Sequence, residues 1–246
     1  MSFKTAMMTL TITLICAAAS PCWAAEEPSM SVDFEVFQGS KYVWRGIVYN
    51  NEPVLQPSLT ASWKSGLSLN LWGNFDETDF GDCKGRCNEL DYTIGYDWES
   101  GGKELSIGYS VYTYPNTEFA GTSEILASCG FGGSLSPALS LAWDVDQARG
   151  LYLNLGLARS VPLGSRSLEI SGGLGFADKR VSNYYYGVPS AGLADASVCV
   201  EVPIESRGGW TITPSVAYTR LIRQSVRESM GRPDNFIFGV KLAKTF

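Results

Sequence analysis

The sequence predicts an all-β protein, a transmembrane antiparallel β-barrel of about 12 strands of the outer-membrane type. Three observations support this fold class. From about Ser31 onward, apolar residues alternate with polar ones, which is the period of a strand and not of a helix. Short turns alternate with longer polar connections. The apolar face of the expected strands carries a single charged residue, Lys244, which lies near a strand end.

Residues 1–25 are expected to form a secretory signal peptide, which leaves residues 26–246 for the barrel. Lys4 precedes an uncharged stretch that is apolar from Leu10 to Ala19 and ends in small residues around "CWAA". Removing this segment takes the formal charge from −6 to −7, because Lys4 is its one charged residue. A nucleic-acid partner requires a basic surface and is therefore not expected.

The expected strands follow one another in hairpins. The first carries Val32, Phe34 and Val36 on its apolar face and continues through Tyr42 and Trp44. The later hairpins turn at "KSG", "SGGK", "GGSLSP", "PLGSRS" and "ESRGG", which are typical turn sequences. The twelve expected strands are 32–44, 55–63, 67–76, 90–98, 105–111, 125–131, 139–145, 151–157, 168–176, 194–202, 210–218 and 236–246.

The connections alternate in length as regularly as the faces alternate in polarity. The longer connections are residues 46–53, 77–88, 115–122, 146–150, 178–190 and 223–234. An even number of strands, with short turns on one rim and long loops on the other, is typical of bacterial outer-membrane barrels. This pattern places both chain ends on the periplasmic side.

The aromatic residues of the apolar face favour lipid outside the barrel over the soluble alternative. They gather near strand ends, as the two girdles of a membrane barrel do. The polar face is largely Ser, Thr, Asn and Gly, whereas a soluble surface carries more charge. The girdle residues are Trp63, Trp98 and Trp210 beside short turns, and Phe75, Trp143, Phe176 and Tyr218 beside long loops.

Several site chemistries are poorly supported by the sequence. The chain has no histidine, which argues against a Ser-His or Asp-His hydrolase, and we expect no enzyme, no cofactor and no metal. The acidic stretches "NFDETDFGDCKG" and "DVDQARG" match no complete calcium loop. "CKGRC" in an exported chain predicts a disulfide between Cys83 and Cys87, with two free thiols or a fortuitous metal pair as alternatives.

The inward face carries the candidate functional residues. By parity it presents more acids than bases, and a water-filled lumen of this kind would prefer cations. In the alternative interpretation, acids and bases pair across a nearly plugged interior. The pore-lining candidates are Lys41, Arg45, Asp76, Asp91, Asp97, Glu124, Asp144, Glu169, Asp195 and Glu201, and Asp33, Glu35, Lys64 and Lys241 share their face.

The stretch "SKYVWRG", followed by "NEPVLQPSLTAS" and "LNLWGNFDETD", resembles the TorF-type porins, exported proteins of Gram-negative bacteria. The resemblance covers residues 31–98, and the chain departs from the family pattern at Lys41 and Pro57. It implies an outer-membrane barrel that acts as a porin, and it supplies no catalytic residue. The residues that match in kind are Tyr42, Val43, Trp44, Arg45, Gly46, Pro53, Gln56 and Trp72.

Together these observations predict a passive channel in the cell outer membrane for small hydrophilic solutes. Arg45 is expected to pair with a carboxylate such as Asp33, Asp76 or Asp91 and so to shape the constriction. Outer-membrane lipid, lipopolysaccharide and the insertion machinery are the expected partners, and Phe246 is the expected insertion signal. The alternative is a structural or adhesive barrel whose extracellular loops bind a partner. The oligomeric state does not follow from the sequence.

Overall fold

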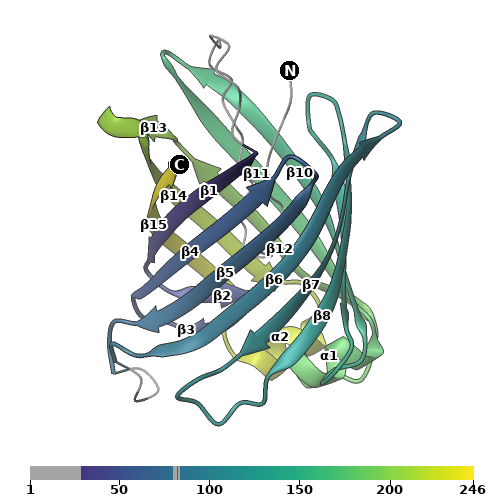
Figure 1. Cartoon of the computed structure of the whole chain (residues 1–246). Coiled ribbons are helices and arrows are strands. Elements are labelled where there is room, and N and C mark those ends of the chain that lie inside the picture. Colours follow the sequence, from purple (N-terminus) through teal and green to yellow (C-terminus); the bar gives the residue numbers. More distant parts are fainter. Residues whose placement is uncertain (1–28, 80–81, 83) are drawn as a thin grey trace.

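The computed structural model of the protein describes residues 29–79, 82 and 84–246. The expected signal peptide, residues 1–25, and Cys83 of the expected disulfide lie outside the described residues. Twelve antiparallel strands form a closed barrel (Figure 1). They are β1 (Met30–Gly39), β4 (Val54–Trp63), β5 (Leu67–Asp76), β6 (Cys87–Ser100), β7 (Lys103–Thr113), β8 (Thr122–Phe131), β9 (Ala138–Asp144), β10 (Leu151–Leu163), β11 (Arg166–Ala177), β12 (Gly192–Glu201), β14 (Trp210–Leu221) and β15 (Asp234–Thr245).

Every strand of the barrel pairs with its neighbours along the chain, and two further pairings close the ring. β12 pairs with β14, and the last strand, β15, pairs with the first, β1. The backbone of Phe246 extends this last ladder, since its N–H donates to Val32 O at 2.9 Å and its carbonyl accepts from Val32 N at 3.1 Å. The predicted fold class, a transmembrane antiparallel barrel of about 12 strands, is confirmed.

The barrel has its apolar side chains outside and its polar side chains inside. Leu69 and Ile94 on the outer face are 46% and 48% exposed, whereas Asn70 and Thr93, each next to one of them in sequence, are 6% and 8% exposed. Because successive strand residues point to opposite faces, this contrast extends along the strands. A lipid-facing barrel requires this arrangement, which is the inverse of a soluble one.

The first strand is shorter than predicted, which corrects the interpretation of residues 32–44. β1 ends at Gly39, and Tyr42 and Trp44 belong instead to a separate hairpin of β2 (Tyr42–Trp44) and β3 (Ile47–Asn50). The reason is local, because Arg45 and Gly46 adopt positive φ angles of 49° and 78° and turn the chain back on itself. Tyr42 is 6% exposed, so this ring lies inside the protein and not on the lipid face.

The remaining elements lie at the two rims. The C-terminus and the start of β1 lie at the same rim as β13 (Ile204–Glu205), and the opposite rim carries α1 (Lys179–Tyr186) and α2 (Gln224–Met230) (Figure 1). A short 3₁₀ turn, Arg207–Gly209, links β13 to β14. Neither helix in the described part of the chain is long and apolar enough to cross a membrane.

Candidate functional site: a hairpin folded into the lumen

The hairpin of β2 and β3 folds from the rim between β1 and β4 into the barrel (Figure 1). Its tip, Arg45–Gly46, contacts the inner wall formed by β12 and β14. A Cβ atom on Gly46 would lie 2.7 Å from Leu221 Cδ2 and 2.9 Å from Asp195 Cβ. Glycine is therefore required at the tip both by its positive φ angle and by this close approach.

Arg45 anchors the tip of the hairpin to the barrel wall. Its two terminal nitrogens donate to the two carboxylate oxygens of Glu124 on β8, each at 2.8 Å. The guanidinium lies over the rings of Trp44, at 4.0 Å, and of Tyr152 on β10, at 4.3 Å. Both charged side chains are only 1% exposed. A bidentate ion pair of this kind, stacked between aromatic rings, has one well-defined geometry.

The surroundings of Arg45 maintain the charge of its guanidinium. Burial alone would lower the pKa of Arg45, but the Glu124 carboxylate and its hydrogen bonds hold that pKa above its ordinary value. The phenol of Tyr186 on α1 donates to the backbone carbonyl of Arg45 at 2.9 Å. The hairpin is thus held at its side chain by the barrel and at its backbone by a helix of the loop rim.

Phenol and hydroxyl donors satisfy the carboxylates around this anchor. Tyr112 donates to Glu124 at 2.9 Å, and Tyr152 donates to Asp195 at 2.8 Å. Tyr185 of α1 donates to Asp144 at 3.0 Å. Burial raises the pKa of the Tyr185 phenol, which therefore remains a donor at neutral pH. These bonds offset the cost of burying the carboxylates.

An apolar cluster fills this part of the interior around the hairpin tip. It joins the hairpin to the inner faces of β9 to β12 and β14, and to the loops and helices of the long-loop rim. Its buried members are Ile47, Ala142, Ala148, Tyr152, Ala177, Val181, Tyr186, Val188, Ala194, Leu221 and Val226. We call this region, with the Arg45–Glu124 pair, the packed half of the lumen.

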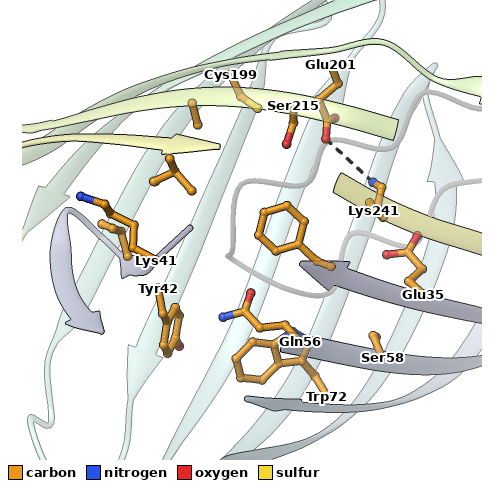
Figure 2. A pocket seen from close by; sticks show the side chains of 14 residues that line it. Glu35, Lys41, Tyr42, Gln56, Ser58, Trp72, Cys199, Glu201, Ser215 and Lys241 are labelled. Carbon is orange, nitrogen blue, oxygen red and sulfur yellow. Dashed lines mark ion pairs between the residues drawn. The ribbon is translucent and has the colours of Figure 1, made fainter. Parts of the chain in front are cut away.

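A cavity of about 90 Å³ lies on the other side of the hairpin. Tyr42 and Val43 of the hairpin form one wall, and inward residues of β1, β4, β5, β12, β14 and β15 form the other. Lys241 Nζ lies 4.0 Å from Glu201 Oε1 at this wall (Figure 2). The lining residues are Glu35, Phe37, Lys41, Tyr42, Val43, Gln56, Ser58, Trp72, Cys199, Glu201, Ser215, Ala217, Ile237 and Lys241.

Figure 2 shows that Glu35, Glu201 and Lys241 gather in one part of this cavity, whereas Lys41 lies in another. Lys41 lies apart from Glu35, Glu201 and Lys241, and its ammonium donates to Asn51 Oδ1 at 3.0 Å. The ring of Phe37 lies over Gly239, where a Cβ atom would overlap the ring. The Phe37 ring can therefore pack against the barrel wall only because residue 239 has no side chain.

The pore-lining candidates are distributed over the whole interior. Lys41 and Glu201 lie at the cavity, and Arg45, Glu124, Asp144 and Asp195 belong to the packed half. The buried Asp76 accepts from Asn74 on its own strand, β5, and from Asn88 on the neighbouring strand, β6. Asp91 is buried on β6, Asp97 is partly exposed near the end of that strand, and Glu169 accepts from Ser160 at 2.7 Å.

The partner of Arg45 differs from those expected. The expectation that Arg45 pairs with Asp33, Asp76 or Asp91 depends on the assumption that Arg45 belongs to the first barrel strand. Because the hairpin crosses the lumen, Arg45 instead reaches Glu124, 79 residues away in sequence. The phenols that support this pair, Tyr112 and Tyr152, are also absent from the expected site. Their position on the inward parity of their strands is the one sequence signal that could have indicated them.

The chain matches a known protein family over most of the barrel. A family model described as "Bacterial protein of unknown function (Gcw_chp)" matches residues 24–219. The chain belongs to this family. The match includes the hairpin and the strands that carry Glu124 and Tyr152. The family description gives no function, and the TorF-type name is not part of it. No curated protein matches the sequence.

Solved structures with the same fold are outer-membrane porins and channels. The KdgM porin in complex with disordered oligogalacturonate is 11% identical, with a TM-score of 0.55 over 88% of this chain and 99% of that one. The NanC porin is 13% identical, with a TM-score of 0.51 over 87% and 98% of the two chains. An outer-membrane channel from Pseudomonas putida F1 is 10% identical, with a TM-score of 0.52 over 94% and 100%. At these identities the likeness establishes a shared fold.

Proposed function

We propose that this Gcw_chp protein is an outer-membrane porin, a passive channel for small hydrophilic solutes, and a relative of the TorF-type porins. The cavity between the hairpin and the wall of β1, β4, β5, β12, β14 and β15 is the observation that carries the proposal. Solutes pass on this side of the hairpin, because the packed half is filled by the Arg45–Glu124 pair and its apolar surroundings.

The outer-membrane location supports this proposal and rests on the apolar outer face and the closed barrel. In this proposal residues 1–25 are the signal peptide, the insertion machinery recognises the C-terminal strand, and lipid and lipopolysaccharide surround the barrel. The protein carries out no chemical step and needs no cofactor. A disulfide between Cys83 and Cys87 in the exported protein would close the loop between β5 and β6; in the structure the Cys87 thiol is free and donates to Glu89 O at 3.2 Å.

The charge balance of the lumen supports a modest cation preference. Within the cavity two carboxylates, Glu35 and Glu201, face two ammonium groups, Lys41 and Lys241, and the excess of acids lies elsewhere on the inner face. The oligogalacturonate in the complex with the KdgM porin is an anion. The acidic lumen of this chain gives no reason to assign it that ligand.

Single-channel recording tests the proposal directly. The full-length mature protein in planar bilayers is expected to give discrete conductance steps with a reversal potential on the cation-selective side. Lys241→Gln should increase the cation preference and Glu201→Gln should reduce it, because each removes one charge at the cavity wall. Glu99→Gln, next to a short turn, is the matched control and should leave the reversal potential unchanged. Correctly folded protein without conductance steps would exclude the channel.

The packed half of the lumen favours a second candidate, a barrel that serves only to present its loops. In that case loops 77–88 and 178–190 bind a partner at the cell surface, and the interior is structural. Deleting loop 77–88 would then abolish adhesion. The same deletion should leave solute flux into vesicles intact if the protein is a channel.

A further inference from the structure

The long-loop rim carries an uneven distribution of charge. The connecting segments 145–150, 178–191 and 222–233, which include α1 and α2, contain six basic and three acidic residues. The loops 77–86 and 114–121, between β5 and β6 and between β7 and β8, contain two basic and four acidic residues. The rim is therefore basic on the side of the helices and acidic on the side of β5 to β8.

Three cations of the basic side lie close together. Arg180 donates to the backbone carbonyl of Arg149 at 2.9 Å, and Lys179 precedes Arg180 at the start of α1. A Cβ atom on Gly150 would lie 2.7 Å from Arg180 Cβ, so the glycine lets α1 approach the loop between β9 and β10. Arg149, Lys179 and Arg180 are all exposed, and we call them the rim triad.

The rim triad takes part in no ion pair between described residues. The Nε of Arg149 donates to the backbone carbonyl of Asp146 at 2.9 Å, which leaves its terminal nitrogens for other acceptors. The nearest acid in the sequence of α1, Asp178, accepts from the backbone N–H of Val181 and caps the helix. The triad is thus a set of exposed positive charges available to a ligand.

Exposed apolar side chains of the barrel's outer face lie close to the rim triad in the chain. Trp143 and Leu151, which are paired across β9 and β10, are 47% and 37% exposed and flank the loop that contains Arg149. Phe176, 38% exposed, lies two residues before Asp178. An outward aromatic band with exposed cations above it matches a lipid whose acyl chains lie against the barrel and whose headgroup carries negative charge.

From this arrangement we propose that the rim triad binds the phosphate groups of a lipid in the outer leaflet, with the lipid's acyl chains lying over Trp143, Leu151 and Phe176. Guanidinium and ammonium groups both recognise phosphate, and Arg149 and Arg180 offer paired donors. The inference depends on the outer-membrane location with the long loops outside. It does not depend on conduction through the lumen.

Native mass spectrometry of the full-length mature protein in phosphatidylcholine nanodiscs tests the site, with bis-phosphorylated lipid A as the probe. The wild-type protein is expected to retain lipid A. The variant Arg149→Gln/Lys179→Gln/Arg180→Gln should reduce retention by at least about tenfold, because each cation near a charged membrane surface contributes to binding. The control Lys84→Gln/Arg86→Gln/Arg166→Gln removes three exposed cations elsewhere and should retain lipid A as the wild type does.

Three outcomes would overturn the proposal. If the control variant lost as much lipid A as the triad variant, the attraction would be non-specific. If the wild-type protein retained dephosphorylated lipid A as well as it retains bis-phosphorylated lipid A, only the acyl chains would bind. Displacement of lipid A by excess inorganic phosphate would assign the triad to free phosphate. Conductance measured on the same variants separates this result from the channel proposal, since the triad lies outside the lumen.

Discussion

At the scale of single residues, the Arg45–Glu124 pair decides where the hairpin lies. Each group is buried, and each is stabilised mainly by the other. A buried pair is weak evidence for net stability, but removing one partner leaves a buried charge without compensation. The pair therefore acts chiefly as a device that specifies one position for the hairpin.

Glu124→Gln is expected to release the hairpin, because a buried guanidinium without its carboxylate costs about 3 to 5 kcal/mol. Trypsin should then cleave after Arg45 in protein reconstituted in vesicles, whereas the wild-type bond should be protected. Glu99→Gln should remain protected. The double variant Arg45→Met/Glu124→Met, which buries no charge, should lose less unfolding free energy in urea than Glu124→Gln. Full protection of Glu124→Gln would contradict the anchoring role.

Gly239 provides a second prediction at this scale. A Cβ atom there would overlap the Phe37 ring and lie 2.9 Å from Gln38 O. Gly239→Ala should therefore lower the unfolding free energy by about 1 to 3 kcal/mol, as overpacking does. At Gly156 on β10 the nearest atoms would lie at 3.7 Å or more, so Gly156→Ala is the matched control. Urea titration in lipid vesicles measures both, and equal stability of the two variants would disprove the close approach.

At the scale of elements, the hairpin β2–β3 is an insertion into an otherwise regular barrel. β1 and β4 remain paired up to Gly39 and Val54, so the chain could close this end with a short turn. Residues 40–53 are thus not required to join the two strands. Their packing against the wall indicates a role in narrowing the lumen.

Replacing residues 40–53 with a four-residue Asn-Gly turn is expected to preserve the barrel and to raise the single-channel conductance. The reason is that the replacement removes the hairpin's share of the packed half, with Arg45 and Ile47, and one wall of the cavity. Shortening loop 115–120, between β7 and β8, serves as the control and should change conductance little. An unchanged conductance after loss of the hairpin would show that another element limits the flow.

At the scale of the whole molecule, the barrel closes through the pairing of its last strand with its first. β15 pairs with β1 from Asp33↔Thr245 to Gly39↔Gly239, and Phe246 completes the ladder at Val32. The ring of Phe246 is 64% exposed, and Lys244 Nζ lies 4.8 Å from its centre. The terminal ring is therefore accessible to a binding partner, as the proposed role of Phe246 as an insertion signal requires.

Deleting Phe246 should lower the yield of inserted protein more than it lowers the conductance of each inserted barrel. The deletion removes an exposed aromatic ring, which is the proposed insertion signal, and two terminal hydrogen bonds, while the inner wall is unchanged. Quantitative immunoblotting of outer-membrane fractions measures insertion, and single-channel recording measures the conductance. Phe246→Tyr, which keeps an aromatic ring, should insert nearly as well as the wild type. Normal insertion of the deletion variant would remove Phe246 as an insertion signal.

Much of this molecule could be predicted from local sequence pattern. The strand period determines which side chains face lipid and which face the interior, so Glu124, Asp195 and Glu201 could be placed on the inner face without a structure. Turn residues and loop lengths determine the number of strands and the two rims. These properties depend on neighbours along the chain and on adjacent strands.

The contents of the lumen were decided only by the tertiary structure. Strand period continues through Tyr42 and Trp44, and it gives no sign that the chain leaves the barrel wall after Gly39. Which of the inward carboxylates binds Arg45 depends on the path of the hairpin across the interior, between residues 79 positions apart. Long-range contacts of this kind arise from packing of the closed barrel, whereas the alternating pattern records only the two environments, lipid and interior, to which each residue is exposed.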